Sequence, residues 1–192
     1  PMNRIIEPLE RMGVTIESNN GFLPISINPG GVQSIDYSPS ISSAQVKSSI
    51  LLAGLGASGK SIIREDIPTR DHTELMLKEL GANINQVENI TINPLQKPLS
   101  SFEMTIPGDP SSAAFFAAAA AMIPNSDLTI KNVLANPRRI GFFSIMKSMG
   151  ADITWKNLKK VAGELVGDVH ILCQPLNGLH IMKKMIPSII DE

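Results

Sequence analysis

The chain repeats itself at an interval of about 69 residues, and this repeat restricts the possible folds more than any other feature. The segment PTRDHTELMLKELGANI (68–84) aligns with NPRRIGFFSIMKSMGADI (136–153). Four pairs of residues stand 69 positions apart: Arg70 and Arg139, Gly81 and Gly150, Ala82 and Ala151, Ser43 and Ser112. A partial copy near the N-terminus places Gly13 at the position of Gly81. A period this long, with helix and strand patterns inside it, predicts a supersecondary module rather than a solenoid.

The middle copy predicts a β-α-β-α-β-β module. SAQVKSSILLAGLGA (43–57) has the apolar spacing of a helix, and KSIIRE (60–65) is typical of a short strand. A second helix follows and ends at Gly81, where a left-handed residue is favoured. Two short strands are expected within 82–93, and the strand FLPISI (22–27) is expected to precede the first helix.

The second helix of the middle copy has a predicted inner and outer face. The residues expected to form its buried stripe are Leu75, Met76, Leu77 and Leu80. On the outer face we expect an ion pair between Glu74 and Lys78, which stand four residues apart.

Composition excludes several classes of protein. The 192 residues are 43% hydrophobic and 18% charged, which suits a globular protein of one or two domains. A net charge of −1 disfavours nucleic acid or an anionic membrane as a partner. The lone Cys173 allows no internal disulfide, no Cys/His cluster has the spacing of a metal site, and a reducing, cytoplasmic location is expected. The apolar run Ala113–Ile123 is shorter than the about 20 residues of a membrane-spanning helix.

The segment SSAQVK (42–47) is a candidate binding turn at the start of the first helix. Ser43, Gln45 and Lys47 could converge with unpaired backbone N–H groups on a phosphorylated ligand. Capping of the helix by Ser43 is an equally valid interpretation of the same residues. The related stretch PGDPSS (107–112) has the turn residues of a helix cap.

Two charged residues are further candidates. Arg70 lies in the loop before the second helix, where a guanidinium group could bind a phosphate. It could equally form an ion pair within the chain, with Asp66, Asp71 or Glu74. Asp191 follows the apolar MIPSII near the end of the sequence and could be a helix cap or a general base.

Five ordered motifs resemble the central part of the bacterial 5-enolpyruvylshikimate-3-phosphate synthase (3-phosphoshikimate 1-carboxyvinyltransferase) family. They are SAQVKSSILLAGL, TRDHTELMLKELGA, PGDPSSAAFFAAAA, NPRRIGFFSIMKSMGADI and IPSIIDE, and together they cover nearly the whole chain. The resemblance implies an α/β (α+β) fold of repeated β-α-β-α-β-β units in two domains. Residues 1–106 would be part of the upper domain and residues 107–192 part of the lower domain, with the crossover at GDPSS.

The resemblance also implies a reaction and roles for individual residues. The family transfers the enolpyruvyl group of phosphoenolpyruvate to the 5-hydroxyl of shikimate 3-phosphate, with no metal or organic cofactor. Ser43 and Gln45 resemble contacts to shikimate 3-phosphate, and Ala44 stands where some relatives have a second serine. Arg70 resembles the arginine that meets the shikimate phosphate. Asp191 resembles the aspartate that accepts the proton of the attacking hydroxyl.

Several family motifs are absent, so we expect an incomplete and inactive fragment. The chain opens with PMNRIIEPLE, without a start methionine and already in a helical pattern. An N-terminal Lys-Ser segment and a later Lys-Glu-Ser/Thr-Asp-Arg stretch are missing. Helix faces left uncovered by truncation would favour self-association, and the residues expected on them are Phe115, Phe116, Phe142 and Phe143. The alternatives are a UDP-N-acetylglucosamine enolpyruvyl transferase, for which Cys173 is no evidence, or a non-catalytic module of the same fold.

Overall fold

The computed structural model describes residues 1–189 and forms two compact units, Pro1–Phe102 and Glu103–Glu192. The boundary therefore falls a few residues before the division expected between residues 106 and 107. That these units are parts of an upper and a lower domain stays a prediction. No helix within residues 1–189 is both long enough and apolar enough to cross a membrane.

The N-terminal unit begins with a helix and a β-hairpin. These are α1 (Asn3–Arg11), β1 (Thr15–Asn19) and β2 (Phe22–Asn28), with β1 and β2 antiparallel. Asn20 and Gly21 join the strands with φ angles of 51° and 77°, as a tight two-residue hairpin turn requires. Residues 22–27 form a strand ahead of α2, as expected, but this turn pairs them with β1, so they are not the first strand of the module.

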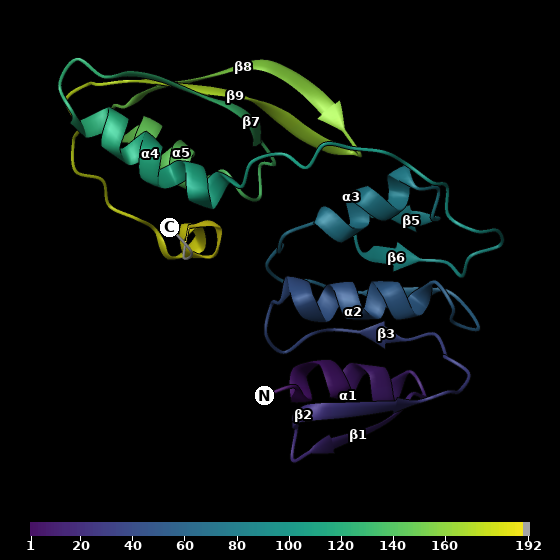
Figure 1. Ribbon diagram of the computed structural model, residues 1–192. Helices are drawn as coiled ribbons and strands as arrows, with labels where there is room; N and C mark the ends of the chain where they lie inside the picture. Colours follow the sequence, from purple (N-terminus) through teal and green to yellow (C-terminus); the bar gives the residue numbers. More distant parts are fainter. Residues whose placement is uncertain (190–192) are drawn as a thin grey trace. The chain divides into compact units, whose positions relative to one another are not determined.

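The complete module of this unit follows the hairpin (Figure 1). Its elements are β3 (Asp36–Tyr37), α2 (Ala44–Gly54), β4 (Ser61–Ile63), α3 (His72–Glu79), β5 (Ile84–Asn85) and β6 (Ile90–Ile92). The strands lie in the order β3-β4-β6-β5, with β3 parallel to β4 and the other neighbours antiparallel. The predicted β-α-β-α-β-β module is confirmed, with β3 as its first strand.

Helix α2 is the centre of the N-terminal core. Its buried apolar residues Val46, Ile50 and Leu51 recur at helical spacing and pack against the strands. Gly54 lies where the helix comes closest to β6, since a Cβ there would stand 2.7 Å from Ile92 Cγ2. The close approach of the two elements therefore requires glycine at this position.

The second unit repeats the module. Its elements are α4 (Pro110–Met122), β7 (Asp127–Leu134), α5 (Gly141–Ser148), β8 (Asp152–Val161), β9 (Glu164–Leu172) and the 3₁₀ helix η1 (Lys183–Ser188). The strands lie in the order β7-β9-β8, which matches β4-β6-β5. Gly108 bridges Val133 in parallel, in the place that β3 takes beside β4. Gly81 and Gly150 have φ angles of +95° and +105°, so both end their helices as predicted.

The interval of 69 residues does not extend to the first helix of each module. Ser43 is the N-cap of α2, whereas Ser112 is the third residue of α4, whose N-cap is Asp109. The expected equivalence of the two serines is therefore wrong. Pro110 favours the first turn of a helix, which explains why α4 begins earlier.

The apolar surface of the second unit is smaller than the sequence predicted. Phe143 is 2% exposed, and its ring centroid lies 5.5 Å from that of Trp155. Phe142 is half-buried and packs edge-on against Phe143. Of these four phenylalanines, Phe115 and Phe116 lie open on α4, at 75% and 64% exposed.

Candidate functional site

The first turn of α2 contains three of the predicted site residues. Ser43 caps the helix in an extended conformation, and the Val46 amide donates to its Oγ at 3.5 Å. Ala44 is the first helical residue, and the exposed Gln45 is the second. The side chains of Ser43 and Gln45 thus flank the backbone N–H groups at the N-terminal end of the helix, where the helix dipole favours an anion.

Arg70 is exposed in the loop between β4 and α3, two residues before the first residue of α3. Polar contacts hold this loop and the start of α3 to α2. Ser48 Oγ and Thr73 Oγ1 lie 2.7 Å apart, and Lys47 Nζ donates to Glu65 Oε2 at 3.1 Å. Thr69 Oγ1 donates to the other oxygen of the Glu65 carboxylate. The structure therefore brings the loop of Arg70 to the helix whose first turn holds Ser43 and Gln45.

Lys47 faces inward, contrary to the expectation that it could face a ligand. Its side chain is 0% exposed, and its Nζ lies 2.8 Å from Glu74 Oε1 as well as 3.1 Å from Glu65 Oε2. The amide of Lys47 donates to the Ser43 carbonyl at 3.0 Å, so Lys47 lies one turn after the cap. Its ammonium group is occupied by two carboxylates.

Glu74 is buried, contrary to its predicted place on the outer face of α3, whereas Leu77 of the predicted inner face is buried as expected. The Glu74 side chain is 1% exposed, so it is not on the outer face with Lys78, whereas Met76 is 36% exposed. Neither carboxylate oxygen reaches solvent, and the Lys47 ammonium group, 2.8 Å from Oε1, is the cation beside it. Burial raises the pKa of Glu74, and the nearby Lys47 opposes this only in part.

The second unit provides an internal reference for the same arrangement. Arg139 occupies the loop before α5 as Arg70 occupies the loop before α3. Its Nη2 donates to Asp109 Oδ1 at 2.7 Å and to Ser111 Oγ at 2.9 Å. Asp109 also accepts from the Ser111 amide at 3.3 Å, which confirms that PGDPSS is a helix cap.

The first turns of α2 and α4 can be compared by counting from their N-caps. Asp109 and Ser111 are the cap and the second helical residue of α4, as Ser43 and Gln45 are in α2. The first unit therefore has a hydroxyl where the second has a carboxylate. An arginine loop beside a helix N-terminus without its own carboxylate is suited to an external anion.

Asp191 lies outside the described residues. Among the side chains that the structure describes, no three His, Cys, Asp or Glu residues are grouped so that they could hold a metal ion.

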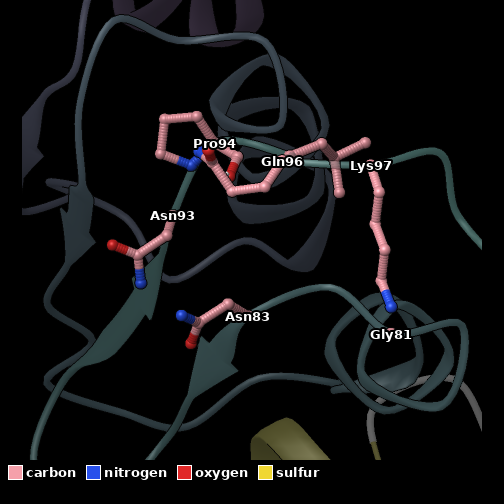
Figure 2. A pocket seen from close by; sticks show the side chains of 7 residues that line it. Gly81, Asn83, Asn93, Pro94, Gln96 and Lys97 are labelled. Carbon is pink, nitrogen blue, oxygen red and sulfur yellow. Dashed lines mark hydrogen bonds between the residues drawn. The ribbon is translucent and has the colours of Figure 1, made fainter.

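A polar hollow of about 310 Å³ lies at the other end of α3 (Figure 2). It is lined by Gly81, Asn83, Asn93, Pro94, Leu95, Gln96 and Lys97. Figure 2 shows the amides of Asn83 and Asn93 near each other and Lys97 extending toward Gly81. None of the predicted site residues lines this hollow.

The inward lysine was missed at the sequence level, although the sequence contained a signal for it. Lys47 stands three and seven residues before the buried Ile50 and Gly54, so it shares their helix face. A lysine on such a face must find carboxylates nearby, because a buried charge without a partner is unstable. The sequence did not indicate that Glu65 and Glu74 would supply them.

Comparison with known proteins identifies the family. The family model described as EPSP synthase (3-phosphoshikimate 1-carboxyvinyltransferase) matches residues 1–191. Proteins named 3-phosphoshikimate 1-carboxyvinyltransferase from Ruthia magnifica and Helicobacter pylori strain J99 are 45% and 48% identical over the whole chain. The chain spans 44% and 45% of the length of these relatives.

Solved structures agree with the sequence comparison. An EPSP synthase from Acinetobacter baumannii is similar over the whole chain and 44% of its own, with a TM-score of 0.89 and 40% identity. The enolpyruvyl transferase NikO from Streptomyces tendae has a TM-score of 0.61 at 16% identity, over 87% of this chain and 42% of its own, which shows the fold alone. The repeated module, the family match and these relatives together place the chain in the EPSP synthase (3-phosphoshikimate 1-carboxyvinyltransferase) family.

Proposed function

We propose that the protein containing this chain transfers the enolpyruvyl group of phosphoenolpyruvate to the 5-hydroxyl of shikimate 3-phosphate. This reaction belongs to the shikimate pathway of aromatic amino acid biosynthesis, and we place it in the cytoplasm. The match to the family over residues 1–191 supports the reaction. Because the chain spans less than half of its curated relatives, we propose that these residues alone are not sufficient for turnover.

One observation supports the substrate site most directly. In the second unit, the carboxylate of Asp109 lies at the N-terminus of α4, and Arg139 contacts it at 2.7 Å. The first unit has Ser43 at that position and Arg70 in the corresponding loop. We propose that the phosphate of shikimate 3-phosphate takes the place of the missing carboxylate.

The proposed roles follow from the chemistry of each group. Ser43 and Gln45 hydrogen-bond the ligand, and Ala44 leaves room beside them. Arg70 supplies the positive charge opposite the phosphate. Asp191 accepts the proton of the 5-hydroxyl as its oxygen bonds to C2 of phosphoenolpyruvate and a proton adds to C3. Loss of a proton from C3 of this tetrahedral intermediate then restores the double bond and expels inorganic phosphate.

Calorimetry on the 192-residue chain tests the binding site. We expect weak binding of shikimate 3-phosphate and no binding of a UDP-sugar. Arg70→Ala should remove most of the signal, because it removes the charge opposite the phosphate. Arg139→Ala is the matched control, since Arg139 has the same place in the other module, where it contacts Asp109, and it should leave binding unchanged.

The chemistry is tested by the release of inorganic phosphate. The chain alone should release no phosphate. A protein extended to the length of the curated relatives should release phosphate, and its Asp191→Ala variant should lose this activity. Tight binding of a UDP-sugar would instead support a UDP-N-acetylglucosamine enolpyruvyl transferase. A chain that binds neither ligand, and an inactive extended protein, would support a non-catalytic module.

We also propose that the chain by itself associates with a second copy through α4. Phe115 and Phe116 lie open on this helix, and Met122 and Ile123 at its end are 65% and 57% exposed. Sedimentation should show concentration-dependent association that Phe116→Ser weakens. A wild-type chain that stays monomeric at high concentration would contradict this proposal.

A further inference from the structure

We infer that Lys47 and Glu65 are positioning residues, which act on the bound anion through the loop that carries Arg70. This inference rests on the proposed function, because it concerns the same anion. Lys47 does not touch the ligand, since its side chain is 0% exposed and its ammonium group is held by Glu65 and Glu74. We therefore expect Lys47 to affect binding by fixing the position of the loop that carries Arg70.

The contacts connect the two halves of the proposed site. Lys47 lies one helical turn after Ser43, and a helical side chain leans toward the N-terminus of its helix. The lysine thereby reaches Glu65 at 3.1 Å, at the start of the loop. Glu65 in turn accepts from Thr69, the residue directly before Arg70. A continuous path of polar contacts therefore runs from the first turn of α2 to the neighbour of Arg70.

The carboxylates around Lys47 argue against direct attraction of an anion by its ammonium group. One ammonium group faces two carboxylates, and the buried Asp71 acts on Glu74 as a further negative charge. The positive charge of Lys47 is thus fully compensated before any ligand arrives. The exposed Arg70 is the cation to which we assign contact with the anion.

The second unit shows that this module does not need the network to build its core. Phe143 stands at the position of Glu74, 69 residues later, and is 2% exposed. Helix α4 contains no charged residue at all. A buried ion pair is often no more stable than apolar residues of similar volume. The ionic contacts in the first unit are therefore better explained by the placement of the loop than by the stability of the core.

The decisive variant is Glu65→Gln, which keeps the side-chain length and an oxygen for Thr69 but removes the charge opposite Lys47. Ile63→Val is the matched control, because Ile63 is 0% exposed on the adjoining strand and has no part in the network. Two quantities are measured by NMR on the 192-residue chain. They are amide exchange within 66–71 without ligand and the affinity for shikimate 3-phosphate.

We expect Glu65→Gln to speed exchange of the loop and to weaken binding about tenfold, the size expected when one charged hydrogen bond is lost. The control should change affinity by less than about twofold, since a single buried methylene is lost away from the site. In an Arg70→Lys background the effect of Glu65→Gln on affinity should nearly vanish. Glu65 acts by orienting the planar guanidinium group of Arg70, and lysine has no such group to orient. A residue with only a structural role would give the same loss in both backgrounds.

The outcomes separate the inference from the proposed function. If the wild type binds shikimate 3-phosphate but the Glu65→Gln and Ile63→Val variants bind it with equal affinity, the inference is wrong and the proposed site stands. An equal loss with and without Arg70 also overturns the inference. If the wild type binds no shikimate 3-phosphate, the proposed site itself is refuted, and the inference falls with it.

Discussion

Replacing Lys47 by methionine should destabilise the N-terminal unit strongly. Methionine keeps most of the length of the lysine side chain but leaves Glu65 and Glu74 without their shared cation. Removing one partner of a buried ion pair costs about 3–5 kcal/mol. Glu65 keeps its bond from Thr69, whereas Glu74 is 1% exposed and loses the cation that lies 2.8 Å from its carboxylate. We therefore expect a loss of about 3 kcal/mol, most of it from Glu74.

The loss should be reversed in part by removing the second charge. Lys47→Met/Glu74→Leu replaces the pair by apolar residues, as Phe143 does at the equivalent position of the second unit. This double variant should recover about 2 kcal/mol relative to Lys47→Met, because the buried Glu74 charge is gone and only Glu65, which keeps its bond from Thr69, still lacks the cation. The single variant should also improve as the pH falls, because protonation neutralises the Glu74 carboxylate.

The assay must report on the N-terminal unit alone. The single tryptophan, Trp155, lies in the second unit, so its fluorescence does not follow the unfolding of the first. Native-state hydrogen exchange of core amides such as Ile50 and Ile63 gives the free energy of opening of the first unit directly. A Lys47→Met variant that loses less than about 1 kcal/mol would refute the reasoning, and so would a double variant with two additive losses.

Two further predictions concern stability. Gly81→Ala should cost about 1 kcal/mol, because φ is +95° but a Cβ there would meet nothing within 4 Å. Gly150→Ala should cost more, since a Cβ added at Gly150 would stand 3.2 Å from the backbone carbonyl oxygen of Pro175, and urea denaturation of the two variants compares them. The contribution of Glu74 to stability should fall as the pH rises above 4.5, because its pKa is raised in the folded state. Glu74→Gln should flatten this dependence above pH 4.5, and an unchanged slope would contradict the assignment.

The sequence alone determined the module and most of its order. Helical spacing of apolar residues and the breaks between them are local signals, which explains why β-α-β-α-β-β could be predicted for the middle copy. Gly81 and Gly150 were predicted for the same reason, since a left-handed residue at a helix end is a local requirement. The cap at PGDPSS also depends only on neighbouring residues.

The tertiary structure decided the features whose partners are distant in the sequence. The sequence pattern placed Glu74 on the outer face of α3, but its cation comes from Lys47, 27 residues earlier in another helix. The contact between Arg139 and Asp109 likewise joins residues 30 positions apart. This contact showed that the N-cap of the second unit is a carboxylate, whereas the N-cap of the first unit, Ser43, is a hydroxyl. Local periodicity indicates which residues share a face of a helix. Which charged side chains of different elements come into contact depends on how those elements pack.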